Sequence, residues 1–208
     1  MNEFDIKAGT WDLNPLRFER SEAVAEHISE RIPLSRSMSA LEFGAGTGIT
    51  GFILKDHVKE ITMMDNSREM IRKIEEKILA TRSDNVHALF FDLENDEWEG
   101  EKFDLLITQM VLHHIPDSKH IINNFYNILN PGGYLAIADL YPEDGSFHGE
   151  GFTGHRGFNP DELSKIVQNY GFTDISSRHC YTMNKQVSEA ESRYFDLFLL
   201  IAKRPSLT

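Results

Sequence analysis

The chain has 208 residues, a formal net charge of −12 and an isoelectric point of about 5.2. A nucleic-acid partner is disfavoured, because proteins that bind phosphate backbones normally carry a basic face. The single cysteine, Cys180, excludes an intramolecular disulfide and fits a reducing compartment, and we expect it to be a buried strand residue.

One domain spanning residues 1–208 is expected, since domains typically hold about 100 to 200 residues. The first residues, Met1 to Asp5, lack the basic and then apolar layout of a signal peptide. The longest apolar run, residues 197–202, is far shorter than the roughly 18 residues of a membrane span. We therefore expect a cytoplasmic protein without a membrane partner. The pattern indicates no particular oligomeric state.

The first predicted helix starts at Asn14-Pro15, because this pair combines a capping side chain with proline at the first helical position. This helix would end before Pro33 and form part of an N-terminal helical cap over residues 1–36. Apolar and β-branched runs then predict seven strands, at residues 39–43, 58–64, 86–91, 103–110, 134–140, 172–181 and 195–202. Helical periodicity predicts helices after Thr47, after the capping box at residues 66–69, and at residues 116–129 and 160–170.

Strands that alternate with helices favour a mostly parallel sheet with helices on both faces. In such sheets ligands bind at the carboxyl ends of the strands. Glu42, Asp65 and Asp92 each stand at or near the end of a predicted strand, as do residues 108–110. The pattern therefore predicts one ligand site that gathers these residues.

A glycine-rich turn follows the first predicted strand. Gly44, Gly46 and Gly48 alternate between that strand and the next helix. Glycine tolerates positive φ and lets a ligand approach the backbone, and a helix N-terminus favours an anionic group. Residues 46–51 also satisfy the dinucleotide pattern G-x-G-x-x-G, which is weak by itself. A dinucleotide site is therefore an alternative for this loop.

The neighbouring segments distinguish these alternatives. Glu42 and the three glycines form an acid-x-Gly-x-Gly-x-Gly run that resembles the first motif of class I S-adenosylmethionine-dependent methyltransferases. Residues 64–70, 91–93, 103–115 and 129–135 resemble the later motifs of that family, in its order and spacing. The resemblance spans residues 41–140. It implies a Rossmann-like three-layer sandwich with a seven-stranded sheet, a last strand that inserts antiparallel, and S-adenosylmethionine as cofactor.

The resemblance also implies which residues hold the cofactor. Asp65 would accept both ribose hydroxyls, which is the role that an acid has in dinucleotide folds. Asp92 would accept the adenine amino group, and the backbone N–H of Leu93 would meet a ring nitrogen. The predicted cofactor residues are Glu42, Gly44, Ala45, Gly46, Gly48, Asp65, Asn66, Asp92, Leu93 and Gln109.

The acceptor is expected to be a small molecule. The fourth predicted strand lacks the Asn/Asp-Pro-Pro-aromatic tetrapeptide of family members that act on exocyclic or amide nitrogens. Correct positioning of the two reactants can be enough for methyl transfer, and a base helps only when the acceptor must lose a proton. His113 and His114 are the best-placed candidate bases, with packing and solvent exposure as the alternative. Trp11 is a candidate for the substrate entrance, with packing as its alternative.

Residues 141–159 are predicted to be a loop beside the site. The loop contains five glycines together with His148, His155 and Arg156. Long loops in compact domains are usually functional or disordered, so we expect a substrate lid, with a passive connection as the alternative. No tight metal-ligand spacing links the histidines of this loop to those after the fourth strand, and no metal site is predicted.

Two further interpretations differ in class from a methyltransferase. The first is an NAD(P)-dependent oxidoreductase, but no separate substrate domain follows the sheet. The second is a non-catalytic protein that keeps the fold and its cofactor. Product formation separates that second interpretation from an enzyme.

Overall fold

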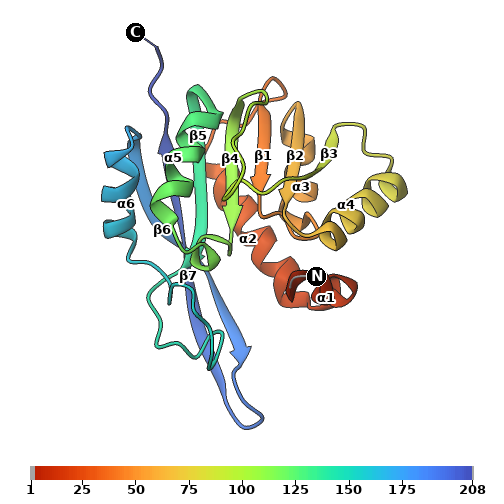
Figure 1. Ribbon diagram of the computed structural model, residues 1–208, viewed down its shortest axis with the longest axis vertical. Helices are drawn as coiled ribbons and strands as arrows, with labels where there is room; N and C mark the ends of the chain where they lie inside the picture. Colours follow the sequence, from red (N-terminus) through yellow and green to blue (C-terminus); the bar gives the residue numbers. More distant parts are fainter. Residues whose placement is uncertain (1–2, 208) are drawn as a thin grey trace.

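A computed structural model describes residues 3–207, and its centre is a seven-stranded sheet in the order β3-β2-β1-β4-β5-β7-β6 (Figure 1). Strands β1 to β5 are parallel, and β7 inserts antiparallel between β5 and β6. The predicted Rossmann-like topology is confirmed. The strands are β1 Ser39–Phe43, β2 Glu60–Asp65, β3 Val86–Phe90, β4 Phe103–Gln109, β5 Leu129–Leu140, β6 Thr173–Gln186 and β7 Ser192–Lys203.

Helices cover both faces of the sheet. They are α1 Glu3–Lys7, α2 Pro15–Arg31, α3 Ile49–Leu54, α4 Arg68–Thr81, α5 Ser118–Ile128 and α6 Pro160–Asn169, with short 3₁₀ turns η1 Ala8–Leu13, η2 Lys55–His57 and η3 Leu112–His114. The core is split by the sheet, because alternate strand residues point to opposite faces. One hydrophobic cluster joins the sheet to α2, α3 and α4, and the other joins it to α5 and α6.

The helix starts follow the capping chemistry of the sequence. Asn14 accepts a hydrogen bond from the N–H of Leu16 at 3.1 Å, and Pro15 occupies the first helical position of α2. The hydroxyl of Ser67 accepts from the N–H of Met70 at the start of α4. Side chains that satisfy the first free N–H groups stabilise a helix by about 1 kcal/mol. These local signals fix where α2 and α4 begin, and hence where the preceding loops end.

The glycine turn between β1 and α3 depends on residues without a Cβ. Gly44, Gly46 and Gly48 all have positive φ, between 56° and 79°. A Cβ at Gly44 would lie 2.5 Å from a methyl of Val111, and one at Gly48 would lie 2.5 Å from the sulfur of Met63. Contacts this short are excluded, so the sharp turn requires glycine at both positions.

Strands β6 and β7 are longer than predicted. They continue as a hairpin in which residues 181–186 pair with residues 192–197. In Figure 1 this blue hairpin extends beyond the other strands, beside the loop at residues 141–159. The predicted sixth strand stopped at Tyr181 because the following residues are mostly polar. The strand is longer because these residues pair with β7, although they show no hydrophobic pattern.

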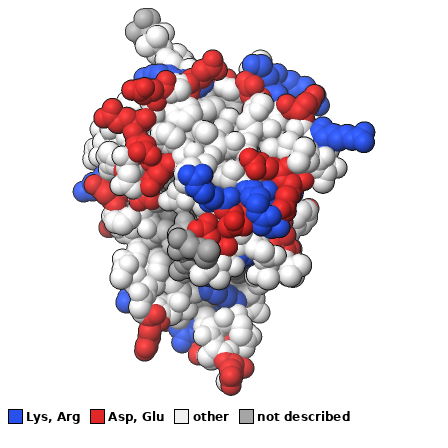
Figure 2. All heavy atoms as spheres, turned by 45° about the vertical axis from the view of Figure 1, so that its right-hand side comes forward, with Lys and Arg blue, Asp and Glu red and all other residues white. Residues whose placement is uncertain are grey.

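Figure 2 shows acidic side chains spread over one face with basic side chains between them. None of the helices within residues 3–207 is long and apolar enough to span a membrane. Cys180 is buried in β6, as predicted, and burial raises the pKa of its thiol to about 12.

Candidate functional site

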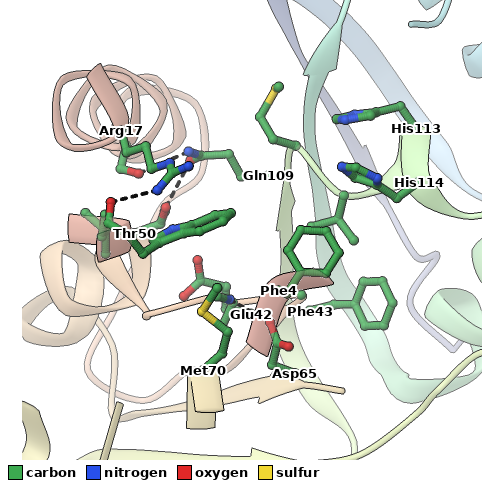
Figure 3. Close-up of a pocket in the computed structure, with 18 of the residues that line it drawn as sticks. Phe4, Arg17, Glu42, Phe43, Thr50, Asp65, Met70, Gln109, His113 and His114 are labelled. Atoms are coloured by element: carbon green, nitrogen blue, oxygen red, sulfur yellow. Dashed lines mark hydrogen bonds between the residues drawn. The ribbon is translucent and has the colours of Figure 1, made fainter. Parts of the chain in front are cut away.

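A cavity of about 470 Å³ lies at the carboxyl ends of β1, β2 and β4, beneath the N-terminal segment. This volume falls in the range of about 300 to 1,000 Å³ that small-molecule sites occupy. Figure 3 shows His113 and His114 on one side of it, Arg17 and Thr50 across from them, and Asp65 near the glycine turn. The predicted site residues that line the cavity are Trp11, Glu42, Gly44, Ala45, Gly46, Asp65, Asn66, Asp92, Leu93, Gln109, His113, His114 and His148.

Asp65 is held in place by the backbone on both sides of its carboxylate. One oxygen accepts from the N–H of Gly46 at 2.7 Å, and the other accepts from the N–H of Ser67 at 2.8 Å. Burial raises the pKa of Asp65 to about 6, although these backbone hydrogen bonds oppose the shift. The carboxylate is therefore fixed at the end of β2, beside the glycine turn.

Glu42 is buried and bonded to the start of α3. Its carboxylate accepts from the N–H of Gly51 at 3.0 Å, which ties the end of β1 to the helix after the glycine turn. Burial raises the pKa of Glu42 to about 8, and the hydrogen bond from Gly51 opposes this. A buried acid with a raised pKa commonly marks a functional site. Here it also sets the geometry of the loop.

Gln109 connects three elements at the end of β4. Its carbonyl oxygen accepts from the hydroxyl of Thr50 at 2.9 Å, and its amide nitrogen donates to the hydroxyl of Ser21 at 3.0 Å. The next residue, Met110, has a φ of 59° and lines the cavity. A positive φ is uncommon outside glycine, and such strain concentrates at functional sites. The backbone therefore turns sharply where β4 enters the cavity wall.

The far end of the cavity is formed by the turn after β3. The carboxylate of Asp92 accepts from the N–H of Glu94 at 3.2 Å and from the side-chain amide of Asn95 at 2.9 Å. Leu93 is buried, and its carbonyl accepts from the side chain of Asn124. Burial and the neighbouring Asp92 raise the pKa of Glu94. The turn is thus bonded into a fixed shape around an apolar floor.

The histidine side of the cavity contains a buried pair. The ring Nδ1 of His113 lies 2.6 Å from Asp139, and both side chains are almost fully buried. Asp139 also accepts from the N–H groups of His113 and Leu140. A carboxylate can only accept, so it holds the proton of the neutral imidazole on Nδ1 and leaves the lone pair on Nε2.

The N-terminal segment lies over the glycine turn. Asp12 accepts from the hydroxyl of Thr47 at 2.5 Å and pairs with Lys77 at 2.8 Å. The ring of Trp11 lies on the cavity wall, with the guanidinium of Arg17 stacked over it at 3.5 Å. The cap therefore closes the cavity above α3 and α4.

Three predicted site residues do not line the cavity. Gly48 faces the core, where a Cβ would meet Met63. The ring Nε2 of His155 lies 3.0 Å from the carbonyl oxygen of Ile115, and its backbone N–H donates to the carbonyl of His113. Arg156 is exposed and donates to the carbonyl of Asp144. The assignment of Gly48, His155 and Arg156 to ligand contact stays a prediction, and the cavity lining does not include these residues.

Several lining residues were not predicted, and four of them are basic. Arg20 of α2 has a buried Nε without a hydrogen-bond partner among residues 3–207, and burial lowers its pKa to about 10. Lys185 of the hairpin donates to the carbonyl of Phe147, and burial lowers its pKa. Lys7 and Arg17 complete this basic group. No sequence signal links positions so far apart, because only the fold brings them together.

Comparison with known proteins agrees with this geometry. Residues 16–177 match a family described as a methyltransferase domain. An uncharacterized methyltransferase of Schizosaccharomyces pombe is 30% identical over 163 residues, which are 74% of this chain and 55% of the relative. A polyketide synthase–nonribosomal peptide synthetase of Aspergillus clavatus is 31% identical over 180 residues, which are 74% of this chain and 4% of that protein. The chain thus spans about half or less of these relatives.

A solved structure shares the fold. The N-methyltransferase NodS of Bradyrhizobium japonicum, in complex with S-adenosylhomocysteine, superposes with a TM-score of 0.67 at 21% identity, over 93% of this chain and 89% of that one. These findings favour methyl transfer over the NAD(P)-dependent alternative. Since the family match covers residues 16–177, which are more than half of the chain, the chain belongs to the class I S-adenosylmethionine-dependent methyltransferases.

Proposed function

We propose that this chain transfers a methyl group from S-adenosylmethionine to a small-molecule acceptor that binds between His113 and the basic group of Lys7, Arg17, Arg20 and Lys185. The observation that carries this proposal is one continuous cavity with backbone-anchored acids at one end and a buried histidine–aspartate pair at the other. When bound, S-adenosylmethionine supplies a methyl group that its sulfonium has already activated.

The residues present fit this cofactor. Gly46 lines the cavity, and a Cβ there would lie 3.5 Å from the ring nitrogen of Trp11, so glycine leaves room between the turn and the cap. Asp65 offers carboxylate oxygens at the end of β2, where the ribose diol would bind. Asp92 and Leu93 would hold the adenine. Gly44 and Ala45 would support the amino-acid part, while Glu42 and Gln109 would act chiefly by fixing the loop and the cap.

The chain's own catalytic contribution would be positioning and removal of one proton. Holding reactants in line can supply effective molarities of about 10⁵ M or more. His113 would accept the proton of an acceptor hydroxyl on Nε2, and Asp139 would stabilise the imidazolium that results. The half-buried His114 and Trp11 would shape the acceptor's surroundings.

The basic group suggests the charge of the acceptor. Four cationic side chains line one cavity in a chain of net charge −12. Their mutual repulsion is relieved when an anion binds among them. An acceptor with a carboxylate or phosphate group is therefore favoured. Residues 141–159, which carry His148, remain our proposed lid over this acceptor.

Product formation tests the proposal. Purified protein is incubated with labelled S-adenosylmethionine and pairs of hydroxylated aromatic acids and their methyl esters, and the transferred label is counted. We expect transfer to at least one acid, less to its ester, and loss of transfer in His113→Gln. Tight S-adenosylhomocysteine binding without transfer to any acceptor of the panel or of a cell extract would instead favour a non-catalytic protein.

A further inference from the structure

Three histidines meet at the acceptor end of the cavity, and methyl transfer as proposed uses only one of them as a base. The ligand-capable ring nitrogens of His113, His114 and His148 all lie within 4.8 Å of one another. His113 and His114 belong to η3, whereas His148 comes from the loop after β5. Such a three-histidine cluster is not visible in the linear spacing, because the fold joins two separate segments.

His113 provides a second, independent observation. Its side chain is 1% exposed, yet its Nε2 has no hydrogen-bond partner within the described part of the chain. Most buried polar atoms are paired, so an orphan of this kind calls for a ligand. Its Nδ1 meets the buried carboxylate of Asp139. Histidines that bind metals almost always donate their second ring N–H to such a group, which orients the ring and raises its basicity.

The three rings are also held by their surroundings. His148 stacks on Phe152 with ring centroids 3.9 Å apart and an interplanar angle of 17°. His114 meets Phe4 edge-on at 5.3 Å. The N–H of His155 donates to the carbonyl of His113 at 2.8 Å, which anchors the loop carrying His148 to η3. The cluster therefore resembles a prepared site more than three mobile side chains.

We propose that His113, His114 and His148 bind one divalent transition-metal ion, with Zn²⁺ as the favoured ion. Imidazole suits Zn²⁺ and its neighbours in the first transition row, and three protein ligands leave one coordination position open. Because all three rings line the cavity, the open position faces the acceptor. Asp139 offsets part of the ion's charge, whereas Arg20 and Lys185 oppose it, so the fourth ligand should be anionic.

The metal site itself does not depend on the proposed function, but its role does. An acceptor hydroxyl that bonds to the ion through oxygen would lose its proton to solvent more easily, as water does on Zn²⁺. The ion and the transferred proton both require the lone pair on Nε2 of His113, so they exclude each other. With metal bound, the ion rather than His113 would promote loss of the proton from the acceptor hydroxyl.

Metal titration of the whole protein tests this proposal without any substrate. Protein stripped with a chelator is titrated with Zn²⁺ by calorimetry, and with Co²⁺ by visible absorption, which reports coordination by nitrogen. We expect one ion per chain, loss of the Co²⁺ bands in His148→Ala, and an affinity about 10- to 100-fold lower in Asp139→Asn. His179→Ala, which alters an exposed histidine of β6, should bind like the unaltered protein.

S-adenosylhomocysteine affinity is measured on the same metal-free samples. Unchanged affinity in His148→Ala shows that the variant is folded and separates this proposal from the proposed function. His148→Ala is the decisive variant, since its side chain lies in a loop and its loss is tolerated more readily than that of buried Asp139. Zn²⁺ binding that is absent, or equal in His148→Ala and the unaltered protein, would overturn the site.

Discussion

The proposed cofactor end and the proposed acceptor end of the cavity are built in different ways. At the cofactor end, Glu42 and Asp65 are bonded to backbone N–H groups of the glycine turn and of α3 or the start of α4. At the acceptor end, His113, His148 and Lys185 come from three separate segments and depend on side-chain packing. One end is therefore set by local backbone geometry and the other by the tertiary fold.

The two ends also differ in charge. Acids gather at the cofactor end, where burial raises the pKa of Asp65 and Glu42. Basic and imidazole groups gather at the acceptor end, where burial lowers the pKa of Arg20 and Lys185. Each end thus contains titratable groups whose charged forms would be more stable in water. That cost is expected where a ligand completes the site. The comparison predicts that substitutions at the acceptor end lower kcat, whereas substitutions at the cofactor end weaken cofactor binding.

The largest effect is expected at the acceptor end. His113→Gln should lower kcat by roughly 10² to 10⁴, because the acceptor loses its proton acceptor while glutamine keeps a similar shape. The affinity for S-adenosylhomocysteine should stay nearly unchanged, since the ring does not hold the cofactor in our account. Steady-state kinetics and calorimetry measure the two quantities. His120→Gln, at an exposed position of α5, is the control. A variant that keeps full kcat would reassign His113 to packing.

At the cofactor end, Asp65→Ala should weaken binding of S-adenosylhomocysteine by about 2 to 4 kcal/mol. A hydrogen bond to a charged group contributes about 1.5 to 3 kcal/mol, and two hydroxyls are involved, though not additively. Calorimetry on the folded variant measures the change. The affinity of Asp65→Asn, which keeps one acceptor oxygen, should fall between the affinities of the unaltered protein and of Asp65→Ala. Equal affinity in all three proteins would place the ribose elsewhere.

The pH dependence of cofactor binding sharpens the same comparison. The pKa of Asp65 in the free protein is raised to about 6, and ribose hydroxyls donate to the ionised form. Affinity should therefore be constant above pH 6 and fall as the pH drops below it, by up to about tenfold per pH unit. Calorimetry from pH 5 to pH 8 follows this change. Asp65→Asn should flatten the profile, and an identical slope in that variant would assign the proton to another group.

The smallest effect is expected at the cap. Asp12→Ala removes the contacts to Thr47 and Lys77 that hold the N-terminal segment over the glycine turn. Exposed ion pairs typically contribute about 0.2 to 1 kcal/mol, so S-adenosylhomocysteine should dissociate a few times faster. Stopped-flow displacement measures this rate. Asp56→Ala removes an exposed pair with Lys55 away from the cap and serves as control. Equal rates in both variants would leave the cap without a role in retention.

The difference between the ends also explains what the sequence could predict. The seven strands follow from periodicity, and the cluster of Glu42, Asp65 and Asp92 follows from the rule that ligands bind at strand ends. The antiparallel last strand was implied by the family resemblance. These features depend on residues close in sequence to a turn or a strand end. The cofactor end was therefore largely predictable.

The acceptor end was not predictable for physical reasons. His148 and His155 lie in the same glycine-rich loop, yet only His148 enters the cavity, while His155 bonds to the backbone of Ile115. Which way each ring turns depends on packing against Phe152 and Phe158, which no pattern specifies. Lys185 reaches the site on a hairpin whose polar strand carries no strong β signal. Gly48 belongs to the glycine motif, yet it faces the core and does not line the cavity.

The central claim is that this cavity binds S-adenosylmethionine rather than a dinucleotide. Calorimetric titration of the unaltered protein with S-adenosylhomocysteine and with NAD, each up to millimolar concentration, tests it most directly. We predict one saturable site for S-adenosylhomocysteine, weakened in Asp65→Ala, and no heat of binding for NAD. Saturable binding of NAD with none of S-adenosylhomocysteine would contradict the account.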